Sequence, residues 1–228
     1  RLVAVSTLPI GKDTLVYGSA DAGKSVHNKD KVVNAAMTEL GKALNLKEHL
    51  VSDVRITGPG DIEVHKGKDG RYYMLDFARM MPPEAPTDPK NPQYIFSKLM
   101  RPEFVKAYEK PLSSDAFSGW QSYDPEKDIH NKEVVEATKF LYQDVIGKIP
   151  ERLCDSGFNY YFKGEICHVS LLHKSGINFR HLGRVRKVVH ASNRFADTEN
   201  FYDVAYLGEM VVRTLKAHLQ LRWRQIMG

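Results

Sequence analysis

The sequence predicts an α+β fold, with a small antiparallel sheet in the first third of the chain and a predominantly helical remainder. Short apolar and aromatic runs bounded by Gly, Pro and Asp turn signals indicate strands within residues 1–81. From residue 132 onward, apolar residues recur at helical spacing. Five prolines in residues 82–92 predict a stiff connection between the two parts. We therefore expect one domain over 1–228, with a sheet-rich part (1–81), a Pro-rich connection (82–92) and a helical part (93–228).

The composition is that of an ordinary globular protein. The chain has 228 residues, of which 42% are hydrophobic and 27% charged. No apolar run approaches the length of a membrane span, so we expect no membrane insertion. Two cysteines are too few for a disulfide framework, which favours an intracellular location. Because Arg1 is not a natural start, we expect a piece of a longer protein.

The expected strands lie in the sheet-rich part, with one helix among them. A helix from about Lys29 to Leu44 is indicated by apolar residues at a period of 3.6. The turns Gly58-Pro59-Gly60 and Lys68-Asp69-Gly70 should reverse the chain between strands. The strands form a plausible antiparallel set and are expected at Leu2–Ser6, Thr14–Tyr17, Val54–Thr57, Ile62–His65 and Arg71–Asp76, with His49–Asp53 returning the chain toward the sheet.

The helical part begins with two short helices, after which the chain lacks a period until residue 132. Residues 110–131 therefore predict a long loop, with Phe117 and Trp120 pinning it to the body. The last helix is capped by Asp197 or Thr198. The other helices are expected at Gln93–Met100, Pro102–Tyr108, Lys132–Ile149, Gly164–Lys174 and Phe179–Val189.

A charged residue ends the strand that leads to the proline pair. Asp76 follows the apolar run Tyr72–Leu75 and is either an anchor or a functional group. As an anchor, it would form an ion pair with Arg79 or Arg71.

Residues 18–25, Gly-Ser-Ala-Asp-Ala-Gly-Lys-Ser, fit the phosphate-loop pattern. A working phosphate loop needs a helix that begins at the lysine, so that the helix N-terminus faces the phosphates. Here the better N-caps are Asn28 and Asp30, beyond the loop. Nucleotide or phosphate binding is therefore an alternative function, and its residues would be Gly18, Gly23, Lys24, Ser25 and Asp76.

The run from Asp61 to Ala78 has the outline of a kinase catalytic segment, in which Glu63 would take the Asn place and Asp76 the metal-binding place. Gly58 stands where the catalytic Asp should be, and no Gly-rich loop with a strand lysine accompanies the run. The histidines have no metal-ligand spacing, and no nucleophile elbow is present. We expect no catalytic residues, no metal and no cofactor.

A basic segment late in the chain suggests a nucleic-acid interface. Net charge is +5, which permits such a partner. Arg180, Arg184 and Lys187 lie three to four apart on one predicted helix face, with Arg186 nearby. These four are the expected RNA-binding residues. A second basic stripe follows at Arg213, Lys216, Arg222 and Arg224.

Four motifs in order resemble the Clu (clustered mitochondria) domain, and the resemblance covers nearly the whole chain. They are Val16–Val26, Asp69–Arg79 with the proline pair, Gly176–Gly183 and Val212–Lys216. Members usually carry Lys-Thr where this chain has Lys24-Ser25. The resemblance implies the central Clu domain of a large cytoplasmic protein needed for mitochondrial distribution and biogenesis. The partners it implies are mRNAs for mitochondrial proteins and a translation initiation factor or the ribosome.

Three functions follow from the sequence. The preferred one is a non-enzymatic cytoplasmic domain that associates with mRNA or a translation ribonucleoprotein. The alternatives are a nucleotide- or phosphate-binding domain and a protein-interaction scaffold. In the scaffold, Gly70 and Gly183 would be turn and packing residues.

Overall fold

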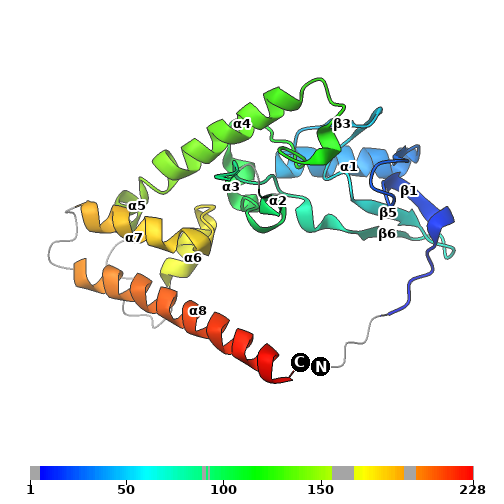
Figure 1. Cartoon of the computed structure of the whole chain (residues 1–228). Helices are drawn as coiled ribbons and strands as arrows, with labels where there is room; N and C mark the ends of the chain where they lie inside the picture. The colour runs from blue at the N-terminus through cyan, green and yellow to red at the C-terminus, as the bar shows by residue number, and fades with distance from the viewer. Residues whose placement is uncertain (1–5, 89–90, 92, 156–166, 193–198, 228) are drawn as a thin grey trace. The chain divides into compact units, whose positions relative to one another are not determined.

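The computed structural model describes residues 6–88, 91, 93–155, 167–192 and 199–227. The chain divides into two compact units, Arg1–Thr138 and Lys139–Gly228 (Figure 1). The sheet belongs to the first unit, and the second unit is helical in its described residues. The predicted α+β fold is confirmed.

A four-stranded antiparallel sheet forms the centre of the first unit. Its strands are β1 (Leu15–Gly18), β2 (His27–Asn28), β5 (Glu63–Lys66) and β6 (Tyr72–Leu75), in the order β2-β1-β5-β6. The hairpin β5–β6 pairs Lys66 with Tyr72 and Glu63 with Leu75. Its turn includes Gly70 at φ 79°, a conformation that costs glycine little because it has no Cβ. Strands β1, β5 and β6 match expected runs, whereas β2 was not expected, and the expected strand Leu2–Ser6 lies almost wholly outside the described residues.

Strands β3 (His49–Val51) and β4 (Val54–Ile56) form a separate two-stranded hairpin. The prediction that the strand at Val54–Thr57 joins the same antiparallel set was therefore wrong. Contact between the two sheets is made by side chains instead of a backbone ladder, and one of them is Asn28, whose Nδ2 donates to the Arg55 carbonyl on β4. The Tyr17 hydroxyl accepts from Thr57 N at 2.7 Å and donates to Thr57 O at 3.1 Å. Burial raises the pKa of Tyr17 to about 12, so this hydroxyl keeps its proton.

Helix α1 (Lys31–Leu44) begins after Asp30, whose carboxylate accepts from Val32 N and Val33 N. Its N-terminus is within two residues of the prediction. The helix ends at Asn45, which takes the left-handed conformation at φ 58°. The side-chain amide of Asn45 then donates to three carbonyl oxygens. That of Val105 lies in helix α3 (Pro102–Ala107), and those of Tyr108 and Lys110 lie just beyond its end.

The remainder of the first unit is loop and short helix. Helix α2 (Tyr94–Ser97) is shorter than expected, whereas α3 agrees with the prediction. Helix α4 (Lys127–Phe140) begins within the segment expected to be a loop, so the loop ends five residues earlier. Trp120 pins this loop to the body as predicted, because its ring packs closely against Gly23 and Gly60. A Cβ atom added at Gly23 would lie 3.2 Å from the ring, and one added at Gly60 would lie 2.4 Å from it. Three 3₁₀ turns lie at Lys12–Thr14, Phe77–Arg79 and Gly119–Gln121.

The second unit begins where α4 widens into a π-helical turn, Leu141–Val145. This turn and helix α5 (Ile149–Asp155) replace the continuous helix expected up to Ile149. Helix α6 is Cys167–Lys174; its expected start at Gly164 and the expected cap residues of the last helix lie outside the described residues. A 3₁₀ turn at Phe179–His181 leads into α7 (Leu182–Ala191), and α8 (Glu199–Met227) follows.

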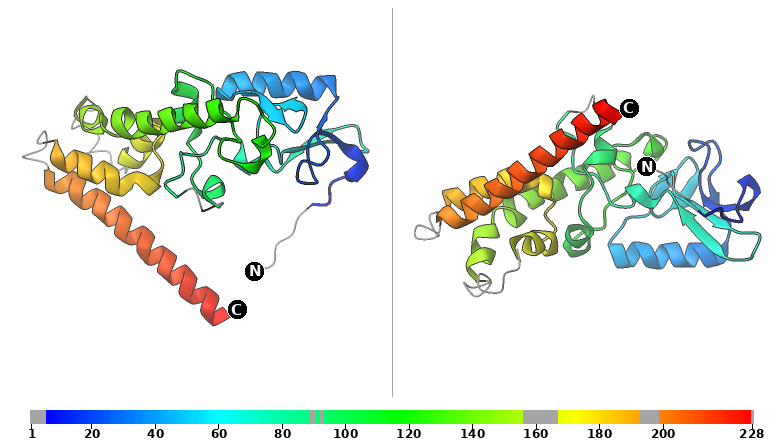
Figure 2. Two further views of the ribbon diagram at one scale, coloured as in Figure 1. Left: turned by 45° about the horizontal axis from the view of Figure 1, so that its top comes forward. Right: turned by 90° about the horizontal axis from the view of Figure 1, so that it is seen from below.

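Helices α7 and α8 pack against each other along the start of α8 (Figure 2). Gly183 lies at this contact, but a Cβ there would lie 3.7 Å from the Met210 side chain, an ordinary van der Waals distance, so the packing does not require glycine. The core of this unit is apolar and includes Ile146, Ile149, Leu172, Ile177, Val185, Val189 and Tyr206.

Candidate functional site

Helix α7 presents two of the four predicted RNA-binding residues to solvent. Arg184 and Lys187 are exposed and lie three residues apart, on the same side of the helix. The Arg184 guanidinium lies 4.2 Å from the centre of the Tyr142 ring, a cation–π contact that orients it. Arg180 and Arg186 are half-buried, and Arg180 belongs to the 3₁₀ turn before the helix. RNA contact by all four residues remains a prediction, with Arg184 and Lys187 the most accessible.

Helix α8 adds further basic groups to this unit. The Arg213 guanidinium stacks 4.2 Å over the Phe179 ring, and its Nε donates to Glu209 at 2.5 Å. Lys216, Arg222 and Arg224 are exposed. Both helices therefore carry arginines whose planar groups are held by aromatic rings, a geometry suited to phosphate recognition.

The positive charge of the chain is concentrated in the second unit. Residues 139–228 contain fourteen Lys and Arg against eight Asp and Glu, whereas residues 1–138 contain nineteen against twenty. The net charge of +5 is therefore a property of the second unit. A polyanion would be attracted to this unit.

The loop Gly18–Ser25 satisfies its own backbone donors. Asp21 accepts from Ser25 N at 2.9 Å and from the Ser25 hydroxyl at 2.6 Å. Gly23 N donates to the Ser19 hydroxyl at 3.0 Å. The hydrogen bonds from the hydroxyl and amide of Ser25 lower the pKa of Asp21 to about 2, so this carboxylate is charged at neutral pH.

Strand β2, rather than a helix, follows this loop, and Lys24 and Ser25 are exposed. The loop thus holds an internal anion where a phosphate loop would bind phosphate, and no helix N-terminus faces it. Asp76, the remaining residue of the nucleotide-binding alternative, lies after β6 and is exposed. That alternative remains a prediction to be tested.

The expected ion pair between Asp76 and Arg79 or Arg71 is wrong. Asp76 sits at φ 51°, at the start of the 3₁₀ turn Phe77–Arg79, and this turn directs Arg79 into the interior. Arg79 donates instead to Asp61, through Nε at 3.0 Å and Nη2 at 2.6 Å, and to Asp115 at 3.0 Å. Arg71 is exposed and lies 3.9 Å from Asp69.

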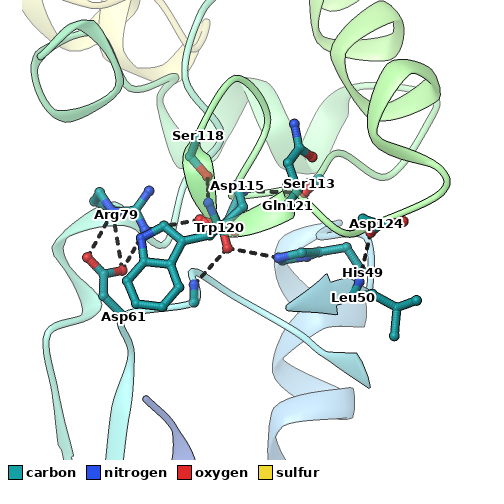
Figure 3. Close-up of polar contacts among 12 residues, drawn as sticks. His49, Leu50, Asp61, Arg79, Ser113, Asp115, Ser118, Trp120, Gln121 and Asp124 are labelled. Carbon is teal, nitrogen blue, oxygen red and sulfur yellow. Dashed lines mark hydrogen bonds and ion pairs between the residues drawn. The ribbon is translucent and has the colours of Figure 1, made fainter. Parts of the chain in front are cut away.

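This arginine is part of a buried polar network that sequence reasoning missed (Figure 3). Asp115 is fully buried, and its carboxylate accepts hydrogen bonds from Arg79 and from Gly60 N, the latter at 2.7 Å. The same carboxylate lies 2.9 Å from His49 Nε2. Burial lowers the pKa of Arg79, but the hydrogen bond to Asp61 and the charge of Asp115 outweigh it and raise the pKa. The network thus fixes a charged arginine in the interior.

A second buried group lies next to the first. The Asp124 carboxylate accepts from Leu50 N and Glu126 N, both at 2.8 Å, and lies 3.3 Å from His130 Nε2. The rings of His130 and His49 meet edge to face at 6.3 Å. Burial is the main cause that lowers the pKa of His130, with Lys47 and His49 acting in the same direction and Asp124 opposing them.

These groups tie together the hairpin β3–β4, the 113–124 loop and α4, and their role is structural. Within the described part of the chain, no three His, Cys, Asp or Glu side chains gather as a metal site requires. Glu63, which would take the Asn place in the kinase-like interpretation, contacts His65 at 3.1 Å. No helix among the described residues is long and apolar enough to span a membrane.

Comparison with known proteins finds similarity to one family in particular. Residues 1–86 match the family model described as clustered mitochondria. A clustered mitochondria protein homolog of Eremothecium gossypii is 27% identical over 193 residues, which are 75% of this chain and 16% of the relative. These matches support a clustered mitochondria (Clu) domain, as the sequence motifs predicted. The motifs Val16–Val26 and Asp69–Arg79 that predicted this domain lie within the matched residues.

Other relatives carry the same description. The clustered mitochondria protein of Arabidopsis thaliana is 34% identical over 119 residues, 47% of this chain and 8% of the relative. A Candida glabrata homolog is 24% identical over 203 residues, 76% of this chain and 15% of the relative. The chain thus spans less than a fifth of the length of these relatives. No solved structure matches the chain.

A second family model matches the other end of the chain. Residues 168–227 match the model described as translation initiation factor eIF3 subunit 135. These residues include α7 and α8, the helices that carry the basic side chains.

Proposed function

We propose that this chain is a non-enzymatic, cytoplasmic part of a clustered mitochondria protein that associates with mRNA or a translation ribonucleoprotein. The observation that carries the proposal is the basic surface of α7 and α8, because the whole excess of positive charge lies in the unit that contains it. The match of this same segment to an initiation factor subunit links it to translation. The preferred partners are mRNAs for mitochondrial proteins, with an initiation factor or the ribosome as the associated machinery.

The contact with RNA is electrostatic in this proposal. Arg184 and Lys187 bind phosphates from α7, while Arg213 and Lys216 extend the surface along α8. The ring of Tyr142 holds the Arg184 guanidinium in a defined orientation, which lowers the entropy lost when it binds a phosphate. The half-buried Arg180 and Arg186 strengthen the local potential without needing direct contact.

The test is binding of the 228-residue chain to single-stranded RNA over a salt series. Replacing Arg184→Glu and Lys187→Glu together should weaken binding and reduce the slope of log K against log salt by about 1.4, since each lost phosphate contact on a single strand contributes about 0.7. The matched control is Lys42→Glu with Lys106→Glu, two exposed lysines of the first unit that change net charge equally. An unchanged slope in a folded α7 variant would contradict the proposal.

A further inference from the structure

Helix α8 exposes a seam of residues at heptad spacing. We define the α8 seam as the positions three and four apart that share one face: Ala205, Gly208, Val212, Leu215, Leu219, Arg222 and Ile226. Of its large apolar members, Val212, Leu215 and Leu219 are 56–60% exposed and Ile226 is 75% exposed. Trp223, beside the seam, is 63% exposed. Exposed apolar side chains over four helical turns indicate an interaction surface.

The second unit does not use this seam for its own packing. The face of α8 that meets its neighbours carries the buried Tyr206, Met210 next to Gly183, and Arg213 over the Phe179 ring. These positions are nearly half a turn away from the seam at 100° per residue. Every residue from 211 to 227 is exposed, so the seam continues well beyond the part of α8 that is packed (Figure 2).

The charge of α8 restricts what fits the seam. Residues 210–227 contain Arg213, Lys216, Arg222 and Arg224 and no Asp or Glu. Arg222 stands at a core position of the heptad pattern, between Leu219 and Ile226. A polar residue at one core position of a helix pair selects its partner, because the opposite side chain must satisfy it.

We propose that the α8 seam docks one amphipathic helix of a separate protein, with heptad-spaced apolar residues, a carboxylate opposite Arg222 and acidic flanks. The carboxylate pairs with the Arg222 guanidinium through two parallel hydrogen bonds. Of the other cations, Lys216 borders the seam and faces an acidic flank, whereas Arg213 and Arg224 lie on the opposite face of α8. This partner buries the apolar stripe and neutralises Arg222 and Lys216 at once.

Other occupants satisfy only one of these features. A second copy of α8 brings no acid within the same stretch, so the Arg222 guanidinium would have no carboxylate partner. RNA pairs with the cations but leaves Val212, Leu215 and Leu219 in water. A lipid surface buries the stripe but places Arg222, in its middle, against acyl chains without a partner.

The experiment uses the full 228-residue chain and two synthetic helical peptides of three heptads. Both have Leu and Val at core positions and Glu on the flanks; one has Glu and the other Lys at the position facing Arg222. The Glu peptide should bind about tenfold more tightly or better, and Arg222→Glu should reverse this preference. Leu219→Glu should abolish binding of the Glu peptide. Gln220→Glu is the matched control, with the same new charge on an exposed residue outside the seam, and should retain binding.

Folding is checked by thermal melting, which Leu219→Glu should leave unchanged because Leu219 is exposed. The proposal would be overturned if Leu219→Glu and Gln220→Glu bound the peptide equally. It would also be overturned by a dimer of the chain that Leu219→Glu disrupts, or by binding to phosphatidylserine vesicles that Leu219→Glu removes. Absence of peptide binding by the unmodified chain would overturn it too. The inference does not rest on RNA binding, although both surfaces include Lys216.

Discussion

Arg79 shows what a single buried charge does in this structure. Its side chain is 4% exposed and bridges Asp61 to the fully buried Asp115. Removing one member of a buried ion pair leaves the partner desolvated and uncompensated, which costs more than the pair itself contributes. We expect Arg79→Ala to lower the free energy of unfolding by about 3–5 kcal/mol.

Urea denaturation measures this change. The control is Arg71→Ala, which removes an exposed arginine from the same part of the chain and should have little effect. If both variants lost similar stability, the network around Asp115 would not have the role assigned to it.

His130 should make the first unit sensitive to mild acid. Its pKa is lowered in the folded state, mainly by burial, with Lys47 and His49 contributing and Asp124 opposing, while Glu133 lies 3.9 Å from Nδ1. As pH falls below about 6.5, the unfolded chain therefore binds a proton that the folded chain does not, and stability decreases down to the folded pKa.

We expect His130→Gln to lose less stability than the unmodified chain between pH 7 and pH 5.5, measured by urea denaturation at each pH. Gln retains an amide donor for Asp124 but has no proton to gain. The control is His27→Gln on β2, a half-buried residue outside the network. Parallel stability curves for His130→Gln and the unmodified chain would contradict this assignment.

At the residue scale, sequence reasoning located the exposed cations but not the buried network. Lys187 and Arg184 could be predicted because charge spacing on a helix is visible in the sequence. The partners of Arg79 could not, since Asp61 and Asp115 are 18 and 36 residues away and no local pattern connects them. The 3₁₀ turn that redirects Arg79 away from Asp76 leaves no clear mark in the sequence either.

The end of α1 is an element whose geometry rests on one residue. Asn45 adopts φ 58° and its amide donates to the carbonyls of Val105, Tyr108 and Lys110. Asn45→Ala should cost about 2 kcal/mol or more, because it removes these hydrogen bonds and strains the left-handed backbone.

Asn45→Gly separates the two causes. Glycine loses the same hydrogen bonds but tolerates positive φ, so it should be about 1 kcal/mol more stable than Asn45→Ala. Differential scanning calorimetry of both variants checks this. Equal stability of the two would show that the left-handed conformation at Asn45 is not maintained.

The loop Gly18–Ser25 is the element that decides the nucleotide-binding alternative. Its amides are bound by Ser19 and Asp21, and a charged carboxylate occupies the loop. We expect ATP with Mg²⁺ to leave the melting temperature unchanged in both the unmodified chain and Lys24→Ala. A rise in melting temperature that Lys24→Ala abolishes would instead support nucleotide binding here.

Elements with a strong local signal were predicted well. The turn Lys68-Asp69-Gly70 gave the hairpin β5–β6, and apolar periodicity gave α1. The hairpin β3–β4 stays outside the main sheet and is linked to it through the tertiary contact between Tyr17 and Thr57, an arrangement that the sequence order of strands does not reveal. The early start of α4 was missed because its first turns carry little apolar periodicity.

At the scale of the whole molecule, the location of charge matters more than its total. The second unit holds the positive excess, while the first is close to neutral. Long-range attraction of RNA is screened over about 8–10 Å at physiological salt, so cations far from the contact surface contribute little to affinity. Two variants of equal net charge should therefore differ in RNA binding according to which unit is changed.

The comparison replaces four exposed cations by Gln in each unit. In the second unit these are Arg184, Lys187, Lys216 and Arg224, and in the first they are Lys24, Lys68, Arg71 and Lys106. Both changes lower net charge by the same amount. The second-unit variant should lose most of its affinity at low salt and most of its salt dependence, whereas the first-unit variant should stay within about threefold of the unmodified chain. Because neither set is buried, both variants should melt as the unmodified chain does. Equal losses in the two variants would mean that RNA responds to net charge alone, and that α7 and α8 form no specific interface.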